Sequence, residues 1–353
     1  MTYILIVFLL FALGLIKYAL NLKKQSIVPF LILTLFIGLR DGIGSDFNNY
    51  YEYFLAFNSI EYNITYEPIY FYLNTLLPNI YTVNLISSLI MFIPLYIICN
   101  KYKINSYLFC ILFMFSDSFF ASFNIVRQLI SASWIMLSFA YLLEKKYYKF
   151  LICLFVSLGF HYSSIYLLVI SVFIYYTNLS ILFYISTCVL TFILSKLNLI
   201  TFFTSFLSII SSNYTQYIEN SNTYSQSGAK FILELLIFAV YPLLFMRKSI
   251  VQSTRISFYL KLFLVGISLS FAAIQLEILY RFSYSFIFFQ IIYIPLLITT
   301  IEKEKKEQSI KTVNVKMVLL YFLAFIIFIL NIYSETFGVV TYDWSGFEKI
   351  FIY

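Results

Sequence analysis

Charged side chains stand beside Gly42 and Gly44 in the stretch GLRDGIGSDFNNY, residues 38–50, which follows a hydrophobic run. Ionisable residues near a membrane are costly, and they usually face a partner, a bundle interior or a water-filled cavity. The planar guanidinium of Arg40 is suited to a phosphate or a carboxylate, and the carboxylate of Asp46 could accept a proton. The alternatives are an arginine that extends to the membrane interface from a helix end and one that pairs with Asp41.

A second polar group lies in SFNIVRQLISAS, residues 122–133. Asn124 and Gln128 are four residues apart and therefore share one face of a helix, and Arg127 lies beside them. An arginine in the outer part of an otherwise hydrophobic helix needs an anion or an outward-facing cavity. Hydrogen bonding between neighbouring helices is the alternative.

The only histidine, His161, lies in GFHYSS, residues 159–164. A single histidine more often makes structural hydrogen bonds than it catalyses a reaction, but its ordinary pKa of about 6.5 suits proton transfer at neutral pH. We therefore expect His161 or Asp46 to act as a proton acceptor, with Glu67 as a further candidate.

Two aromatic regions accompany these residues. In QLEILYRFSYSF, residues 275–286, Arg281 follows Glu277 by four residues and lies near two tyrosines, so it could face a phosphate or sugar or simply pair with Glu277. The other region is the loop after residue 40, whose tyrosines could stack on sugar rings or form an ordinary interfacial belt. Its tyrosines are Tyr50, Tyr51, Tyr53, Tyr62, Tyr66, Tyr70 and Tyr72.

The elements that position these residues are hydrophobic helices. Of the 353 residues, 62% are hydrophobic and 11% are charged, whereas an ordinary soluble domain has about 25% charged residues. Hydrophobic runs near span length recur along the chain, and the alternating pattern of a β-barrel is absent. The sequence therefore predicts an all-α polytopic membrane protein with about twelve spans. We place these spans at residues 3–20, 27–39, 83–99, 104–120, 122–143, 147–160, 162–177, 179–195, 230–246, 257–275, 279–300 and 317–334.

The basic residues predict which connections are cytoplasmic, because cytoplasmic loops have an excess of lysine and arginine. They fall in alternate connections if the short segment at 67–77 is a re-entrant or interfacial helix and not a full span. Both termini and all candidate residues then lie on the outer side. The basic residues are Lys23 and Lys24, Lys101 and Lys103, Lys145, Lys146 and Lys149, Arg247, Lys248 and Arg255, and those at 302–316.

We expect a single membrane domain, residues 1–353, with outer loops at 40–82 and 196–229 and a basic cytoplasmic loop at 302–316. Residues 1–20 have neither a basic start nor a cleavage site, which predicts a retained helix. The net charge of +7 is divided among short clusters between spans, which argues against a nucleic-acid partner. The usual nucleotide, zinc-protease and serine-hydrolase motifs are missing, and so is an acidic metal pair. We therefore expect no cofactor and no metal.

Taken together, the motifs resemble those of the EpsG family of Wzy-type polysaccharide polymerases. The resemblance extends from about residue 30 to 300, through GLRDGIGSDFNNY, YEPIYFYLN, NIVRQLISASWIML, GFHYSS and LYRFSY. It departs from the family at Pro68-Ile69, where the family often has Pro-Gly or Gly-Phe. The matching residues are Arg40, Gly44, Asp46, Tyr50, Glu67, Asn124, Arg127, Gln128, His161 and Arg281.

The resemblance implies a GT-C-like glycosyltransferase in the bacterial cytoplasmic (inner) membrane with its site on the periplasmic side. Its partners are donor and acceptor undecaprenyl-diphosphate-linked oligosaccharides, membrane lipids and a chain-length regulator. The arginines, with Asn124, Gln128 and Tyr50, would bind the diphosphate and glycan. One of His161, Asp46 and Glu67 would accept the hydroxyl proton.

Three other functions use similar chemistry. An O-antigen ligase would take the same donor, a flippase would show internal repeats and polar groups at the bilayer midplane, and an acyltransferase would need its histidine near a cytoplasmic acyl donor. The resemblance does not distinguish a polymerase of O-antigen, and hence lipopolysaccharide, from one of capsule or exopolysaccharide.

Overall fold

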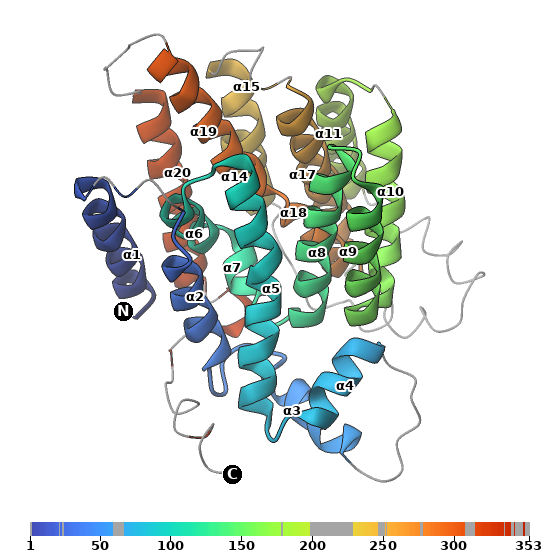
Figure 1. Cartoon of the computed structure of the whole chain (residues 1–353). Coiled ribbons are helices and arrows are strands. Elements are labelled where there is room, and N and C mark those ends of the chain that lie inside the picture. Colours follow the sequence, from blue (N-terminus) through green and yellow to red (C-terminus); the bar gives the residue numbers. More distant parts are fainter. Residues whose placement is uncertain are drawn as a thin grey trace. The chain divides into compact units, whose positions relative to one another are not determined.

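The structure is a computed structural model, and every regular element in the residues that it describes is helical, as the sequence predicts (Figure 1). The chain divides into two compact units, Met1–Tyr166 with Glu302–Tyr353 and Leu167–Ile301. The single domain expected from the sequence stays a prediction. The described residues are 2–20, 22, 25–58, 67–177, 179–197, 229–245, 251, 253–275, 278–307, 315–334, 336–339, 342 and 349.

Each unit is built from helices of very different length. The first unit contains α1 (Thr2–Ala19), α2 (Val28–Gly38), α3 (Phe47–Phe57), α4 (Pro68–Leu76), α5 (Ile80–Tyr102), α6 (Ser106–Phe115), α7 (Asp117–Ala121), α8 (Val126–Leu142), α9 (Tyr147–Phe160), η1 (Tyr162–Ser164), α20 (Val315–Tyr333) and η5 (Thr336–Gly338). The second contains α11 (Ile181–Lys196), α14 (Ala229–Leu235), the π-helix η4 (Leu236–Val240), α15 (Tyr241–Phe245), α17 (Thr254–Ala273) and α18 (Ile278–Ile287). Two helices include the boundary between the units, α10 (Ile165–Tyr176) and α19 (Gln290–Glu307).

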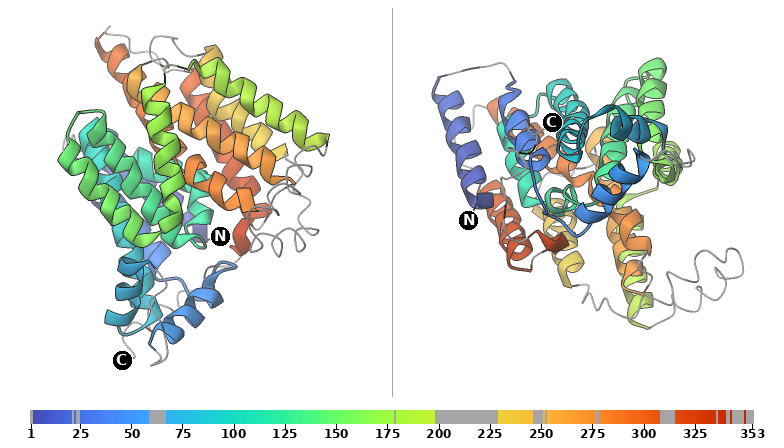
Figure 2. Two further views of the ribbon diagram at one scale, coloured as in Figure 1. Left: turned by 90° about the vertical axis from the view of Figure 1, so that its right-hand side faces the viewer. Right: turned by 90° about the horizontal axis from the view of Figure 1, so that it is seen from below.

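The centre of the first unit is α8, which packs on α5 and α9, while α5 also packs on α2. Helix α6 contacts α1, α2 and α20. The short helices α3 and α4, both blue, lie at the end of α5 where that helix begins (Figures 1 and 2). Side-chain caps define two helix starts, since Asn79 accepts from the N–H of Thr82 at 2.9 Å and Asn105 accepts from that of Tyr107 at 3.0 Å.

Two predicted spans are each divided into two helices. The prediction at 104–120 is wrong at Ser116, which is extended and separates α6 from α7. The Ser116 hydroxyl bonds the carbonyl of Phe113 at 2.7 Å, and such local bonds compete with helical ones. The second predicted span, 279–300, consists of α18 and α19, with a turn at residues 288–289.

Five described segments are long and apolar enough to cross a membrane, and five shorter helices are apolar too, which indicates a membrane-embedded protein. The total of about twelve spans and the GT-C-like fold stay predictions, but α4 forms where the re-entrant helix is expected. The five segments are Thr2–Ala19, Ile80–Tyr102, Thr254–Ala273, Leu279–Glu304 and Val315–Tyr333.

Some predicted features lie wholly or mostly outside the described residues. They are the outer loop at 196–229, the centre of the basic loop at 302–316, and residues Lys23, Lys24, Tyr62, Tyr66, Arg247, Lys248 and Glu277.

The described basic connections of the first unit lie together at one end. Lys101, near the end of α5, pairs with Glu144, which follows α8. Gln25, just before α2, accepts hydrogen bonds from the N–H and hydroxyl of Ser106 at 3.2 and 3.0 Å. Because α5 and α8 both end here, their N-termini lie at the opposite end of the unit, and so does the C-terminus of α2. The candidate residues of the first unit lie next to the helix ends at this opposite end.

Candidate functional site

The turn after α2 is shaped by Gly44 and Asn124. Gly44 has a positive φ of 97°, and a Cβ there would lie 2.7 Å from the carbonyl oxygen of Phe123. The Asn124 side-chain oxygen accepts hydrogen bonds from the hydroxyl of Ser45 at 3.1 Å and from the N–H of Asp46 at 3.0 Å. Asn124, a predicted glycan contact, is thus buried and joins this turn to the start of α8.

Arg40 lies in the same turn and is only 1% exposed. Its Nη1 donates to the carbonyl of Ile37 at 3.0 Å, and its guanidinium lies 5.8 Å from the ring centre of Phe123. Within the described part of the chain, its Nε and Nη2 have no hydrogen-bond partner. Burial lowers the pKa of Arg40 to about 10, so the group is still a cation at neutral pH. A buried cation with unused donors is costly unless an anion binds it.

Glu67, which immediately precedes α4, joins two other candidates. Its Oε2 accepts from Nη1 of Arg127 at 2.7 Å, and its Oε1 lies 3.0 Å from Nδ1 of His161. All three side chains are mostly buried, with exposed fractions of 10% for Glu67, 19% for Arg127 and 20% for His161. The structure therefore brings together three residues that the sequence separates by 60 and 94 positions.

The ionised carboxylate of Glu67 determines which ring nitrogen of His161 carries the hydrogen. Burial alone raises the pKa of Glu67, but the hydrogen bond from His161 and the charge of Arg127 outweigh it and lower the pKa to about 2. Glu67 is then an acceptor only, so the His161 nitrogen that faces it, Nδ1, is the N–H donor. In the neutral ring the lone pair then lies on Nε2, which is the nitrogen that can take up a proton.

Close packing of α4 on α9 places Glu67 beside His161. A Cβ on Gly159 would lie 2.4 Å from Cδ1 of Ile69, so the absence of a side chain lets the two helices approach. His161 itself is extended, just after α9, and its carbonyl accepts from the hydroxyl of Ser164 at 2.6 Å. Ile69 fills the space above Gly159.

Tyr50 and Tyr70 lie near both arginines. Both phenol groups are buried and within electrostatic range of both Arg40 and Arg127. The guanidinium of Arg127 lies 5.3 Å from the ring centre of Tyr70, a cation–π distance. We name Arg40, Tyr50, Glu67, Tyr70, Arg127 and His161 the arginine–histidine cluster.

The remaining predicted site residues are Asp46, Gln128 and Arg281. Asp46 precedes α3 and uses its backbone N–H, not its carboxylate, in the contact with Asn124. Gln128 donates to the hydroxyl of Tyr166 at 3.4 Å. Arg281 belongs to the second unit, where it is exposed on α18, near Tyr280 and Tyr284, whose hydroxyls lie 2.6 Å apart.

Sequence reasoning missed the contribution of the C-terminal segment. The hydroxyl of Tyr342 donates to the carbonyl of Phe36, and the two rings stack with centroids 4.3 Å apart. Lys349 pairs with Asp41, the residue after Arg40. The alternative in which Arg40 pairs with Asp41 is thus not the arrangement found, since Asp41 pairs with Lys349 and Arg40 donates to Ile37. No local motif signals these contacts, because more than 300 residues separate the partners.

The chemistry of the cluster follows from its groups. Two guanidinium groups near the N-terminus of α8 suit an anion with more than one charge. An imidazole oriented by a carboxylate suits proton transfer. The match to known families bears on the same residues, since the EpsG family model covers residues 23–344 of the chain.

The chain belongs to the EpsG family. EpsG family members are similar to Wzy-type polysaccharide polymerases, which points to a membrane protein of polysaccharide biosynthesis. All of the candidate residues lie inside the EpsG match, whereas α1 precedes it. No curated protein and no solved structure matches the chain.

Proposed function

We propose that the chain is a membrane glycosyltransferase that polymerises oligosaccharide repeat units linked to undecaprenyl diphosphate. A hydroxyl of a new unit attacks the anomeric carbon of the growing glycan, and the bond from that carbon to the diphosphate oxygen breaks. The reaction takes place on the periplasmic side of the bacterial cytoplasmic membrane. Both substrates are lipid-linked, which agrees with a site at one end of membrane-embedded helices.

The buried guanidinium of Arg40 is the observation that supports the proposal most strongly. Its Nε and Nη2 have no partner among the described residues, and a diphosphate supplies acceptors for both. Arg127 contributes a second cation, and a guanidinium has donors on two edges, so it can hold a carboxylate on one and a phosphate on the other. The leaving diphosphate gains negative charge as the glycosidic bond breaks, and preorganised cations stabilise that charge.

His161 accepts the proton of the attacking hydroxyl at Nε2. Glu67 holds the other nitrogen, Nδ1, and stabilises the imidazolium that forms, as the carboxylate does in a catalytic triad. This assignment favours His161 over Glu67 as the base, because a carboxylate with a pKa of about 2 is a weak proton acceptor. The lipid-linked product of transfer is one repeat unit longer, and the other product is undecaprenyl diphosphate.

The test is glycan analysis in a strain that lacks this chain and is complemented with wild type, Arg40→Gln or Arg127→Ala. Loss of one preorganised charge typically lowers a rate by about 10²–10³-fold, so each variant should replace the polymer ladder with single repeat units. Arg255→Ala is the matched control, because Arg255 is the second residue of α17 just as Arg127 is the second residue of α8. It should leave the ladder intact.

Two results would contradict the proposal. A normal ladder in both variants, at normal protein levels, would show that the two cations are not needed. A strain without the chain that displays no repeat units at all would favour a ligase or a flippase, because those proteins act on single units as well as on polymer.

A further inference from the structure

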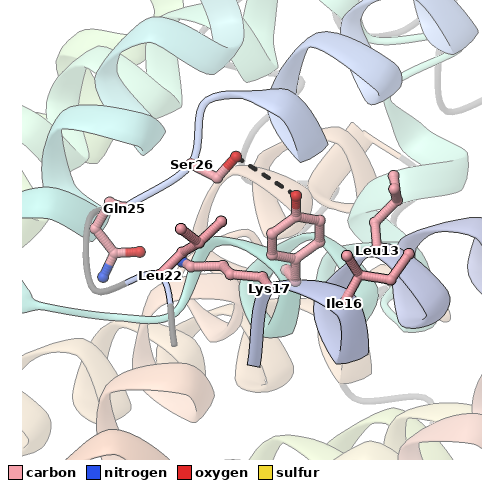
Figure 3. Close-up of a pocket in the computed structure, with 7 residues that line it drawn as sticks. Leu13, Ile16, Lys17, Leu22, Gln25 and Ser26 are labelled. Carbon is pink, nitrogen blue, oxygen red and sulfur yellow. Dashed lines mark hydrogen bonds between the residues drawn. The ribbon is translucent and has the colours of Figure 1, made fainter. Parts of the chain in front are cut away.

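A cavity of about 300 Å³ lies beside α1, at the opposite end of the first unit from the arginine–histidine cluster. Figure 3 shows residues of α1 on one side and Ser26, at the start of α2, on the other. The lining is amphipathic, with hydrophobic side chains and four polar ones. It consists of Leu13, Ile16, Lys17, Leu22, Gln25, Ser26 and Tyr107.

Three of the four polar side chains that line this cavity have hydrogen-bond partners. The hydroxyls of Ser26 and Tyr107 are 3.5 Å apart, and Gln25 accepts from Ser106. The ammonium of Lys17 lies 5.7 Å from the ring centre of Tyr107. In the part of the chain that the structure describes, it has no carboxylate partner. The cavity therefore contains a positive charge that a ligand can neutralise.

The position of Lys17 along α1 indicates where such a ligand would sit. Lys17 is in the last turn of an 18-residue helix that is long enough to span a bilayer, so its ammonium lies near the lipid headgroups. Leu13 is one turn nearer the bilayer centre. The cavity thus offers a cation and hydroxyls at headgroup depth and hydrophobic walls below them.

We propose that this cavity binds one anionic phospholipid. Its phosphate would contact Lys17 and the hydroxyls of Ser26 and Tyr107, and its acyl chain would lie along Leu13. The sequence adds two lysines, Lys23 and Lys24, to the same connection, and each basic residue near an anionic surface strengthens such binding. A zwitterionic lipid brings a positive group as well, so the positive charge of Lys17 selects against it.

The cavity is built in part by residues outside the family match. Leu13, Lys17 and Leu22 precede residue 23, where the EpsG match begins, whereas Ser26 and Tyr107 lie within it. The proposed lipid site therefore combines residues that precede the EpsG match with residues inside it. It does not depend on the proposed polymerase reaction.

The test is native mass spectrometry of the purified full chain in detergent, titrated with phosphatidylglycerol or phosphatidylcholine of matched acyl chains. Wild type should bind the first phosphatidylglycerol more tightly than phosphatidylcholine. Lys17→Gln should weaken that preference roughly fivefold, the effect expected for one basic residue, and Leu13→Trp should weaken binding by filling the cavity. Lys196→Gln is the matched control, because Lys196 also ends a helix beside an aromatic ring, 5.7 Å from that of Phe192.

Each outcome decides the proposal. It holds if Lys17→Gln and Leu13→Trp weaken phosphatidylglycerol binding while Lys196→Gln does not. It is overturned if the two lipids bind equally, if all three variants behave alike, or if a polyprenyl diphosphate occupies the cavity in preference to phosphatidylglycerol. Lys17→Arg keeps the charge and should bind as wild type does, so the comparison with Lys17→Gln decides the question even if Leu13→Trp does not fold.

Discussion

Glu67 makes the contacts that turn two separate candidates into one group. Arg127 is in the first turn of α8, where the helix dipole disfavours a positive charge, and the carboxylate at 2.7 Å offsets that cost. The same carboxylate orients His161. Removing Glu67 would therefore leave a poorly compensated arginine and an unoriented imidazole together.

Glu67→Gln should lower stability by about 1.5–3 kcal/mol at neutral pH, since hydrogen bonds to charged groups are worth that much. The pKa of Glu67 is lowered from 4.5 to about 2. Its charge therefore stabilises the fold fully above about pH 4.5, and that stabilisation disappears as the pH falls through about 2. Thermal melting of wild type and variant across pH checks this. A difference that already shrinks between about pH 8 and 5 would contradict it.

Arg127→Lys should restore polymer poorly in comparison with wild type, although it keeps the charge. A lysine ammonium is a point charge and lacks the planar fork that can engage a carboxylate and a phosphate together. The measurement is the ladder of surface glycan at equal protein levels. Full activity of Arg127→Lys would mean that charge alone suffices at this position.

Residue type alone was enough to single out Arg40, Arg127 and His161, because ionisable side chains are rare in this hydrophobic chain. The pairing within the cluster could not be predicted, since no local pattern indicates that Glu67 lies between Arg127 and His161. Tyr70 was one of many tyrosines, and its contact with Arg127 is visible only in the structure.

At the scale of the elements, the approach of α4 to α9 decides whether the cluster forms. Gly159 is the point of contact, and Ile69 occupies the space that its missing side chain leaves. The pair is local to two helices, so it can be perturbed without touching any charged residue.

Gly159→Leu should destabilise the protein by about 1–3 kcal/mol, the usual cost of overpacking, and should lower polymer yield by moving Glu67 away from His161. Ile69→Ala in the same chain should recover part of both losses, because it reopens the space. Melting temperature and glycan ladders of the single and double variants give a double-mutant cycle. Independent, additive effects of the two substitutions would argue against this contact.

The hydrophobic runs predicted most helices to within a few residues, α9 at 147–160 among them. The prediction failed at Ser116, where the side-chain hydroxyl competes for a backbone carbonyl and the helix ends. Hydrophobic residues continue past this point, so hydrophobicity does not reveal the break. The short α4 was recognisable from the prolines that border it, but its partner helix was not, since packing of two helices depends on shape rather than on composition.

At the scale of the whole molecule, the C-terminal segment holds the turn that contains Arg40. The contacts are a stacked pair and a hydrogen bond between Tyr342 and Phe36, and an ion pair between Lys349 and Asp41. Gly338 also approaches Ser45 in this turn. The turn is thus supported by α8, through Asn124, and by residues that follow α20.

Tyr342→Ala should lower stability by about 1–2 kcal/mol, since it removes both a hydrogen bond and an aromatic pair. Tyr342→Phe keeps the ring and should cost less. Lys349→Ala should cost under about 1 kcal/mol and only at low salt, because the pair is partly exposed. Melting temperatures at low and high salt distinguish the effects of the three substitutions. An equal loss for Tyr342→Phe and Tyr342→Ala would show that the ring stack contributes nothing.

The contacts of Tyr342 and Lys349 with residues 36–41 also affect the order in which the protein folds during its synthesis. Tyr342 follows Phe36 by 306 positions, and Lys349 follows Asp41 by 308. A ribosome therefore adds more than 300 residues after the turn with Arg40 before Tyr342 and Lys349 can contact it. The helices of the unit from α1 to α20 precede both partners in the chain, so they can form while the contacts of Tyr342 and Lys349 are still missing. The turn can therefore bond Asn124, just before α8, first and gain its contacts with Tyr342 and Lys349 afterwards.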